Sequence, residues 1–124
     1  MTNFEGLQLA QPILHAIADE GYTTPSPIQA KSIPPLLEGR DLLGVAQTGT
    51  GKTAAFALPL LHRLSKHAVK SRPNQPHALI LAPTRELAGQ IGDSLRTYAR
   101  HLGLRSRVIF GGVSARPQIK VLNQ

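Results

Sequence analysis

The fold is decided by the stretch Leu42-Leu43-Gly44-Val45-Ala46-Gln47-Thr48-Gly49-Thr50-Gly51-Lys52-Thr53. Its first four residues form a short apolar run that predicts a buried strand, and the apolar residues that recur after it predict a helix. A glycine-rich loop between a strand and a helix is typical of a phosphate site, because backbone N–H groups converge on an anion at a helix N-terminus. Residues 46–53 therefore predict binding of a nucleoside triphosphate.

The residue types of this loop have distinct tasks. Gly49 and Gly51 allow backbone conformations, and a close approach of phosphate oxygens, that a Cβ would prevent. We expect Lys52 to neutralise charge on the β- and γ-phosphates, and the Thr53 hydroxyl to be a ligand of a Mg²⁺ ion that bridges them. The strict phosphate-loop pattern begins with Gly, whereas this loop begins with Ala46. The prediction therefore depends on residues 51–53 and on the flanking strand and helix.

Two further apolar runs follow the loop helix. Residues 78–82 and 108–110 are predicted to be buried strands, and Thr84 is placed to cap a long helix between them. Apolar residues recur along the inner face of that helix at intervals of three or four positions: Leu87, Ile91, Leu95, Tyr98 and Leu102. Strands that alternate with helices at this spacing predict an α/β fold with a parallel β-sheet flanked by helices.

Two short helices are predicted upstream of the loop. Pro12 suits the first turn of one helix, and Gly21 is a stop signal after it. Ser26 followed by Pro27 has the form of an N-cap and a first helical residue, and we expect the pair Pro34-Pro35 to interrupt that second helix.

Composition excludes several classes of protein. Hydrophobic residues make up 41% of the 124 residues and no cysteine is present, which argues against disorder, disulfides and thiolate metal sites. No apolar run approaches the roughly 20 residues that span a bilayer, and the start has no signal-peptide pattern. We therefore expect a soluble cytoplasmic protein without a membrane partner. No two of the five histidines stand four residues apart, so they are expected at the surface without a transition metal.

The net charge of +7 is unevenly distributed. Residues 1–39 hold one Lys and four acids, giving −3, whereas residues 40–124 hold thirteen bases and three acids, giving +10. A basic part of this kind indicates either a polyanionic partner or a well-solvated surface, and charge alone does not separate the two.

Four motifs occur in a characteristic order. They are Gly21-Tyr22-Thr23-Thr24-Pro25-Ser26-Pro27-Ile28-Gln29, the loop from Ala46 to Thr53, Pro83-Thr84-Arg85-Glu86-Leu87, and Gly111-Gly112. In this order they resemble the Q motif, the phosphate loop, motif Ia and the double-glycine element of the DEAD-box family of ATP-dependent RNA helicases. Ala at the first loop position is normal in that family. The stretch Phe110-Gly111-Gly112-Val113-Ser114 looks most like the bacterial RhlE-type subgroup.

The resemblance implies a fold and a set of nucleotide contacts. The chain would be the N-terminal part of the first RecA-like domain, with N-terminal helices and a Q-motif-like segment in residues 1–39 and an incomplete ATP-binding core in residues 40–124. Gln29 would bind the adenine edge, with Tyr22 nearby and Phe4 stacking on or covering the base. A Gln amide has a donor and an acceptor that match N6 and N7 of adenine. By itself, Gln29 would be better explained as a surface residue of a helix, and the neighbouring Pro25, Ser26 and Ile28 favour the adenine contact instead.

The same resemblance implies contacts with RNA. Pro83, Thr84, Arg85 and the pair Gly111-Gly112 would contact the sugar-phosphate backbone of single-stranded or structured RNA, largely independently of sequence. Ligands of open parallel sheets lie beyond the carboxyl ends of the strands, where these residues are expected. A structural salt bridge is the alternative role for Arg85.

The Asp-Glu-Ala-Asp box of the family does not occur in residues 1–124. We therefore expect a chain truncated before this box, with little or no ATPase activity of its own, because phosphoryl transfer depends on positioned charges. A non-catalytic nucleotide-binding or RNA-binding module is the alternative, and an unrelated phosphate-loop kinase or GTPase is disfavoured by the other three motifs. An incomplete sheet would also leave apolar surfaces for self-association.

Overall fold

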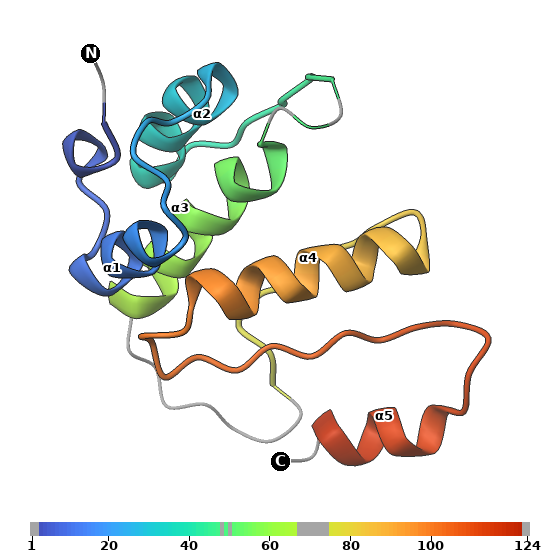
Figure 1. Ribbon diagram of the computed structural model, residues 1–124. Coiled ribbons are helices and arrows are strands. Elements are labelled where there is room, and N and C mark those ends of the chain that lie inside the picture. The colour runs from blue at the N-terminus through green and yellow to red at the C-terminus, as the bar shows by residue number, and fades with distance from the viewer. Residues whose placement is uncertain (1–2, 48, 50, 67–74, 123–124) are drawn as a thin grey trace.

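The helix that follows the phosphate loop, α3 (Lys52–Lys66), lies at the centre of the fold. The computed structural model describes residues 3–47, 49, 51–66 and 75–122. Around α3 lie a short 3₁₀ turn, η1 (Glu5–Leu7), and the helices α1 (Gln11–Asp19), α2 (Pro27–Leu37) and α4 (Arg85–Tyr98). The helix α5 (Ala115–Leu122) lies apart from this group, below α4 in the view of Figure 1.

The core forms where η1, α1 and α2 pack on one side of α3. Ile13, Ile33 and Leu58 are at most 1% exposed, and they come from α1, α2 and α3 in turn. Smaller residues of α3, such as Ala54, complete the contact with the N-terminal helices. Residues from 1–39 and from 40–124 thus share one hydrophobic core, and the division between these two ranges stays a prediction.

The predicted start of α2 is confirmed, whereas its predicted end is wrong. Ser26 is the N-cap and Pro27 the first helical residue, but the helix continues through Pro34 and Pro35 to Leu37. Both prolines lack an N–H group and lose one helical bond each. Their carbonyl groups still accept bonds, from Glu38 N at 3.2 Å and from Arg40 N at 3.1 Å. Burial of Ile33 against the core holds the helix together across this defect.

The long helix α4 begins as predicted. Thr84 is its N-cap, and its Oγ1 accepts a hydrogen bond from Leu87 N at 3.1 Å. Gly92 faces the third apolar run, because a Cβ built on it would lie 2.4 Å from Cγ2 of Val108. The absence of a side chain at Gly92 therefore lets residues around Val108 approach α4 closely.

The predicted parallel sheet is not found among the described residues. The runs at 42–45, 78–82 and 108–110 are irregular segments without a strand. Leu43 and Val45 are 91% and 88% exposed, and Leu79 and Leu81 are 80% and 85% exposed. Apolar residues alone do not make a strand, because each strand needs a neighbour that pairs with its backbone. Within the part of the chain described here, the sheet stays unconfirmed.

No described helix combines the length and the apolar character that crossing a bilayer would require.

A long-range hydrogen bond joins α3 to the start of α1. His62 Nδ1 accepts it from Ala10 N at 3.0 Å, and this nitrogen can accept only when it is unprotonated. Burial lowers the pKa of His62 from its ordinary value of 6.5, and Lys66 lowers it further. The unfolded chain therefore takes up this proton more readily than the folded chain.

We predict that His62→Ala lowers the free energy of unfolding by about 1 kcal/mol near neutral pH, the usual value of one hydrogen bond. The contribution of His62 is complete above pH 6.5 and declines as the pH falls from there toward the lowered folded pKa. The difference between wild type and variant, measured by urea unfolding, should therefore shrink on acidification. His77→Ala, at an exposed position, is the control. A difference that stays constant with pH would contradict this role.

Candidate nucleotide and RNA interface

The phosphate loop enters α3 through a glycine. Among its described residues, Gly49 has φ +84° and Gly51 has φ +88°, a left-handed conformation that other residues rarely adopt. The carbonyl oxygen of Gly51 accepts the first helical bond from Ala55 N at 3.1 Å. Lys52 follows as an exposed side chain, and Thr53 is partly buried. The first N–H groups of a helix have no partner within the helix, so this helix start is suited to an anion.

Two residues of the predicted set, Thr48 and Thr50, lie outside the described residues. Ala46 and Gln47 precede them in the irregular segment that leads into α3, with Ala46 partly buried and Gln47 exposed.

Gln29 connects the Q-motif-like segment to the phosphate loop. Its Oε1 accepts a hydrogen bond from Ser26 N at 3.0 Å, as part of the capping box of α2. Its Nε2 donates to the carbonyl oxygen of Gly51 at 3.2 Å. A Cβ on Gly51 would lie 2.3 Å from Gln29 Nε2 and 3.0 Å from Ser26 Oγ. Only glycine fits here, and the two motifs form one structural unit.

The amide of Gln29 keeps hydrogen-bonding groups that could serve a base. The amide of Gln29 has two N–H groups and two acceptor lone pairs, and one of each is used within the chain. The second N–H and the second lone pair match the number of bonds that adenine requires.

The two predicted aromatic contacts differ in their surroundings. Tyr22 is 52% exposed, whereas Phe4 is 6% exposed and belongs to the core with Leu7 and Leu9. The family resemblance implied that Phe4 stacks on or covers the base, but its apolar ring is removed from water in the core of this structure. Stacking of Phe4 on a base stays a prediction that requires its ring to leave the core.

Two of the predicted RNA-binding motifs come together in space. A Cβ on Gly112, which has φ +75°, would lie 3.8 Å from Nη1 of Arg85. Pro83, Thr84 and Arg85 are exposed at the start of α4, and Gly111 and Gly112 are exposed in the turn before α5. In Figure 1 both segments lie on the right-hand side of the molecule, whereas the loop that leads into α3 lies at the top.

A side chain of α5 holds the two ends of the turn at Gly111-Gly112. Gln118 Oε1 accepts a hydrogen bond from Phe110 N at 2.7 Å, and its Nε2 donates to Phe110 O at 3.2 Å and to Ser114 O at 3.1 Å. Sequence reasoning missed Gln118, because a single glutamine in a short polar helix carries no signal of its own.

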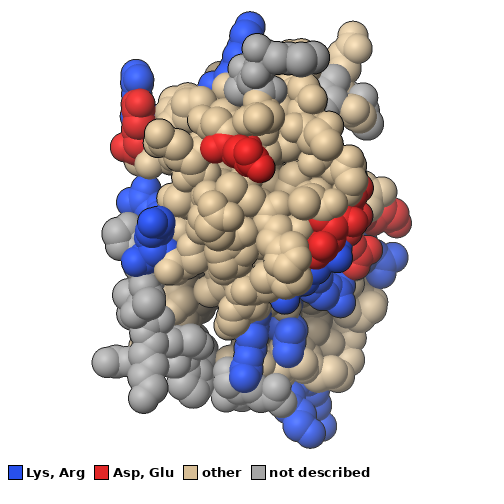
Figure 2. Space-filling model, turned by 60° about the vertical axis from the view of Figure 1, so that its left-hand side comes forward, with Lys and Arg blue, Asp and Glu red and all other residues tan. Residues whose placement is uncertain are grey.

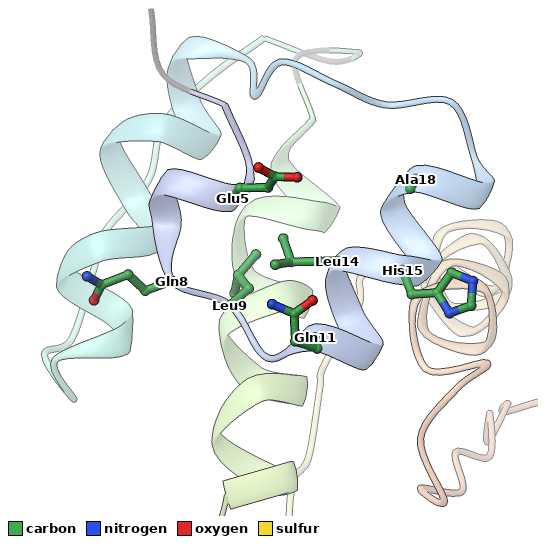
Figure 3. A pocket seen from close by; sticks show the side chains of 7 residues that line it. All are labelled: Glu5, Gln8, Leu9, Gln11, Leu14, His15 and Ala18. Carbon is green, nitrogen blue, oxygen red and sulfur yellow. The ribbon is translucent and has the colours of Figure 1, made fainter.

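Other surfaces lie away from this interface. A hollow of about 550 Å³ is lined by residues of η1 and α1, among them Glu5, Gln11 and Leu14, and not by the phosphate loop (Figure 3). In the view of Figure 2, several Lys and Arg side chains gather on the lower part of the face, and Asp and Glu side chains lie above and beside them.

Comparison with known proteins agrees with the motifs. Residues 26–124 match the DEAD/DEAH box helicase family. The chain is 47% identical over 124 residues to the ATP-dependent RNA helicase DeaD of Klebsiella pneumoniae, covering 99% of this chain and 18% of that protein. It is 48% identical over 125 residues to the ATP-dependent RNA helicase SrmB of Escherichia coli K12, covering 100% of this chain and 28% of that protein.

A solved structure supports the fold. The RNA helicase Prp28 of Chaetomium thermophilum bound to ADP matches with a TM-score of 0.86 and 46% identity, covering 99% of this chain and 30% of that one. This likeness supports the predicted RecA-like class, although no strand is seen in the described residues. The RhlE-type subgroup stays a prediction.

The chain spans only 18% and 28% of the two curated relatives above. Within that span, the glycine loop that opens α3, its bond to Gln29 and the family match over residues 26–124 lead to one assignment. The chain belongs to the DEAD/DEAH box helicase family.

Proposed function

We propose that this chain is the ATP-binding N-terminal portion of an ATP-dependent RNA helicase. The observation that carries the proposal is the hydrogen bond from Gln29 Nε2 to the Gly51 carbonyl, because it holds a base-reading amide against a phosphate loop. The likeness to Prp28, which was solved bound to ADP, supports an adenine nucleotide as the ligand.

The triphosphate would lie at the start of α3. N–H groups of the loop and of the first helical turn hold phosphate oxygens, and Lys52 adds a positive charge beside them. Thr53 is the second residue of α3, so its hydroxyl is placed beside the same phosphates and fits a hard cation that prefers oxygen ligands. When bound, Mg²⁺ would neutralise phosphate charge there.

Recognition of adenine would follow from the same amide. Gln29 is held by its bonds to Ser26 and Gly51, so its remaining donor and acceptor point in a fixed direction. Tyr22 is exposed and is available to cover the base. This arrangement favours ATP over GTP, because guanine presents an acceptor where adenine has its N6 donor.

RNA would bind at the start of α4 and the turn before α5. Arg85 supplies a guanidinium beside Gly112, and the two glycines leave the backbone open to a phosphate. Contacts of this kind position a strand without reading its sequence. The charge of +10 on residues 40–124 adds long-range attraction for RNA.

The activity of the whole protein is part of the proposal. Such a helicase remodels RNA when two RecA-like domains close over ATP, and residues 1–124 contain no Asp-Glu-Ala-Asp box. By itself the chain should bind ATP with little or no hydrolysis. A non-catalytic module for nucleotide or RNA is the second candidate. We also propose a cytoplasmic location and two parts, residues 1–39 and 40–124.

We predict that Lys52→Ala weakens ATP binding at least about 10-fold, since a charge-assisted hydrogen bond contributes on the order of 1.5–3 kcal/mol. Calorimetry or a fluorescent ATP analogue gives the dissociation constant. Lys66→Ala at the other end of α3 is the matched control and should bind ATP as the wild type does. Equal affinities of Lys52→Ala and wild type would refute the phosphate-loop assignment.

A second prediction separates the two roles of Gln29. Gln29→Glu keeps an oxygen that accepts from Ser26 N but loses the donor to Gly51, whereas Gln29→Ala loses both bonds. Thermal unfolding should therefore show a loss of about 0.5–1 kcal/mol in Gln29→Ala and a smaller change in Gln29→Glu. Both variants should bind ATP more weakly.

The affinity for inorganic tripolyphosphate, which has no base, shows whether Gln29 acts on the loop or on adenine. If Gln29 acts by holding the loop, both variants bind tripolyphosphate more weakly. If it acts only on adenine, the affinity for tripolyphosphate is unchanged while that for ATP falls. Unchanged affinity for both ligands would contradict either role.

We further propose self-association through the exposed apolar segments. Leu43, Leu79 and Leu81 are each at least 80% exposed, and apolar surface of this kind drives association in water. Light scattering should detect a mass that grows with concentration, and Leu79→Lys combined with Leu81→Lys should reduce it. A wild-type chain that stays monomeric over the whole concentration range would exclude the association.

A further inference from the structure

Three side chains with metal-binding atoms meet where α1 ends and α4 has just ended. His101 Nε2 lies 2.7 Å from Asp19 Oδ2, and His15 Nε2 lies 3.6 Å from Asp19 Oδ1. The two imidazole rings are stacked, with centroids 3.9 Å apart and planes inclined by 5°. All three ligand atoms lie within 4.8 Å of one another.

The group is open to solvent on one side. The side chains of Asp19 and His101 are 33% and 32% exposed, and that of His15 is 63% exposed. Figure 3 shows the His15 ring turned away from Glu5 and Leu9 and toward a neighbouring helix. An ion could therefore enter from water and keep a water ligand.

The charges around the group leave Asp19 able to bind a cation. The hydrogen bond with His101 is the main reason that the pKa of Asp19 lies below its ordinary value, and His15 and Arg100 lower it too. Asp19 is thus a carboxylate at neutral pH. Arg100 Nη1 lies 3.6 Å from Asp19 Oδ2, but the guanidinium also donates to the Glu20 carboxylate, so an acid offsets its charge.

We propose that His15, Asp19 and His101 form a binding site for a divalent transition metal of the zinc class, with water as a fourth ligand. Imidazole nitrogen with one carboxylate oxygen is a donor set that suits Zn²⁺, whereas Mg²⁺ and Ca²⁺ prefer oxygen alone. This site is distinct from the magnesium position expected at Thr53.

The distances to Asp19 suit a metal ion, whereas the two rings must turn to bind it. Zinc bonds of about 2.0–2.1 Å in a tetrahedron place ligand atoms about 3.3 Å apart. The distances from Asp19 to His101 and to His15, 2.7 Å and 3.6 Å, lie on either side of this value. A metal ion lies in the plane of each imidazole that binds it, so binding would break the parallel stack of the rings and replace the hydrogen bond between His101 and Asp19.

The structural consequence is a link between distant parts of the chain. His101 and Asp19 are 82 positions apart in the sequence, and α1 and α4 already contact each other. An ion bound here would stabilise the folded chain by an amount that grows with the logarithm of its concentration over its dissociation constant. The alternative is that the cluster acts only as an ion-pair link, for which added metal changes nothing.

The test is a titration of the chain, without a polyhistidine tag, with Zn²⁺ by calorimetry and with Co²⁺ by visible absorption. We expect one bound ion per chain, a Co²⁺ d–d band of nitrogen and oxygen ligation, and a higher melting temperature with Zn²⁺. His15→Ala and His101→Ala should each weaken binding at least about 10-fold, as the loss of metal-site groups commonly does. His77→Ala, at an exposed position outside the cluster, should bind like the wild type.

Arg100→Met provides an independent check, because removing a cation next to Asp19 should strengthen Zn²⁺ binding even if the ion pair with Glu20 is lost. Circular dichroism confirms that each variant is folded. The proposal is overturned if the wild type binds no Zn²⁺ or Co²⁺, or if His77→Ala weakens binding as much as His15→Ala and His101→Ala do. Weaker rather than stronger binding by folded Arg100→Met would also overturn it.

Discussion

The carbonyl oxygen of Gly51 is the atom on which the junction of the Q-motif-like segment with the glycine loop depends. It accepts the first helical bond of α3 from Ala55 N at 3.1 Å and a second bond from Gln29 Nε2 at 3.2 Å. The backbone of Gly51 also has a left-handed conformation, which costs a non-glycine residue roughly 1–2 kcal/mol. One glycine therefore starts α3, orients the amide of Gln29 and leaves room for it. Movement of either motif must change the other.

The two faces of α3 are buried to different depths. Helices α1 and α2 cover the face of α3 that carries Leu58 and Leu61, while Phe56 and Leu60 on its other side stay half-buried. The run at 78–82 has the composition of a strand buried on both faces, but Leu81 is 85% exposed. Pairing of strands depends on a second segment of chain. An apolar run therefore predicts that its own residues tend to be buried, but it does not identify the segment that would pack on them.

The helix starts at Ser26 and Thr84 were predicted correctly from the sequence, whereas contacts between distant residues were missed. Both starts can be predicted locally, because the capping side chain bonds to a backbone N–H group only three residues further along the chain. The interruption predicted at Pro34 was wrong because packing of Ile33 outweighed a local defect. The contacts that assemble the sites, Gln29 with Gly51 and Asp19 with His101, join residues 22 and 82 positions apart. No local pattern encodes such pairs.

The turn at Gly111-Gly112 shows how a side chain can bind backbone groups that a strand would otherwise pair with. In a sheet, the N–H and C=O groups of Phe110 would pair with the backbone of a neighbour. Here the amide of Gln118 satisfies both, with bonds of 2.7 Å and 3.2 Å. The turn at Gly112 thus keeps its position beside Arg85 without a ladder. A strand that paired with Phe110 on that side would compete with Gln118 for the same two groups, so pairing there and docking of α5 exclude each other.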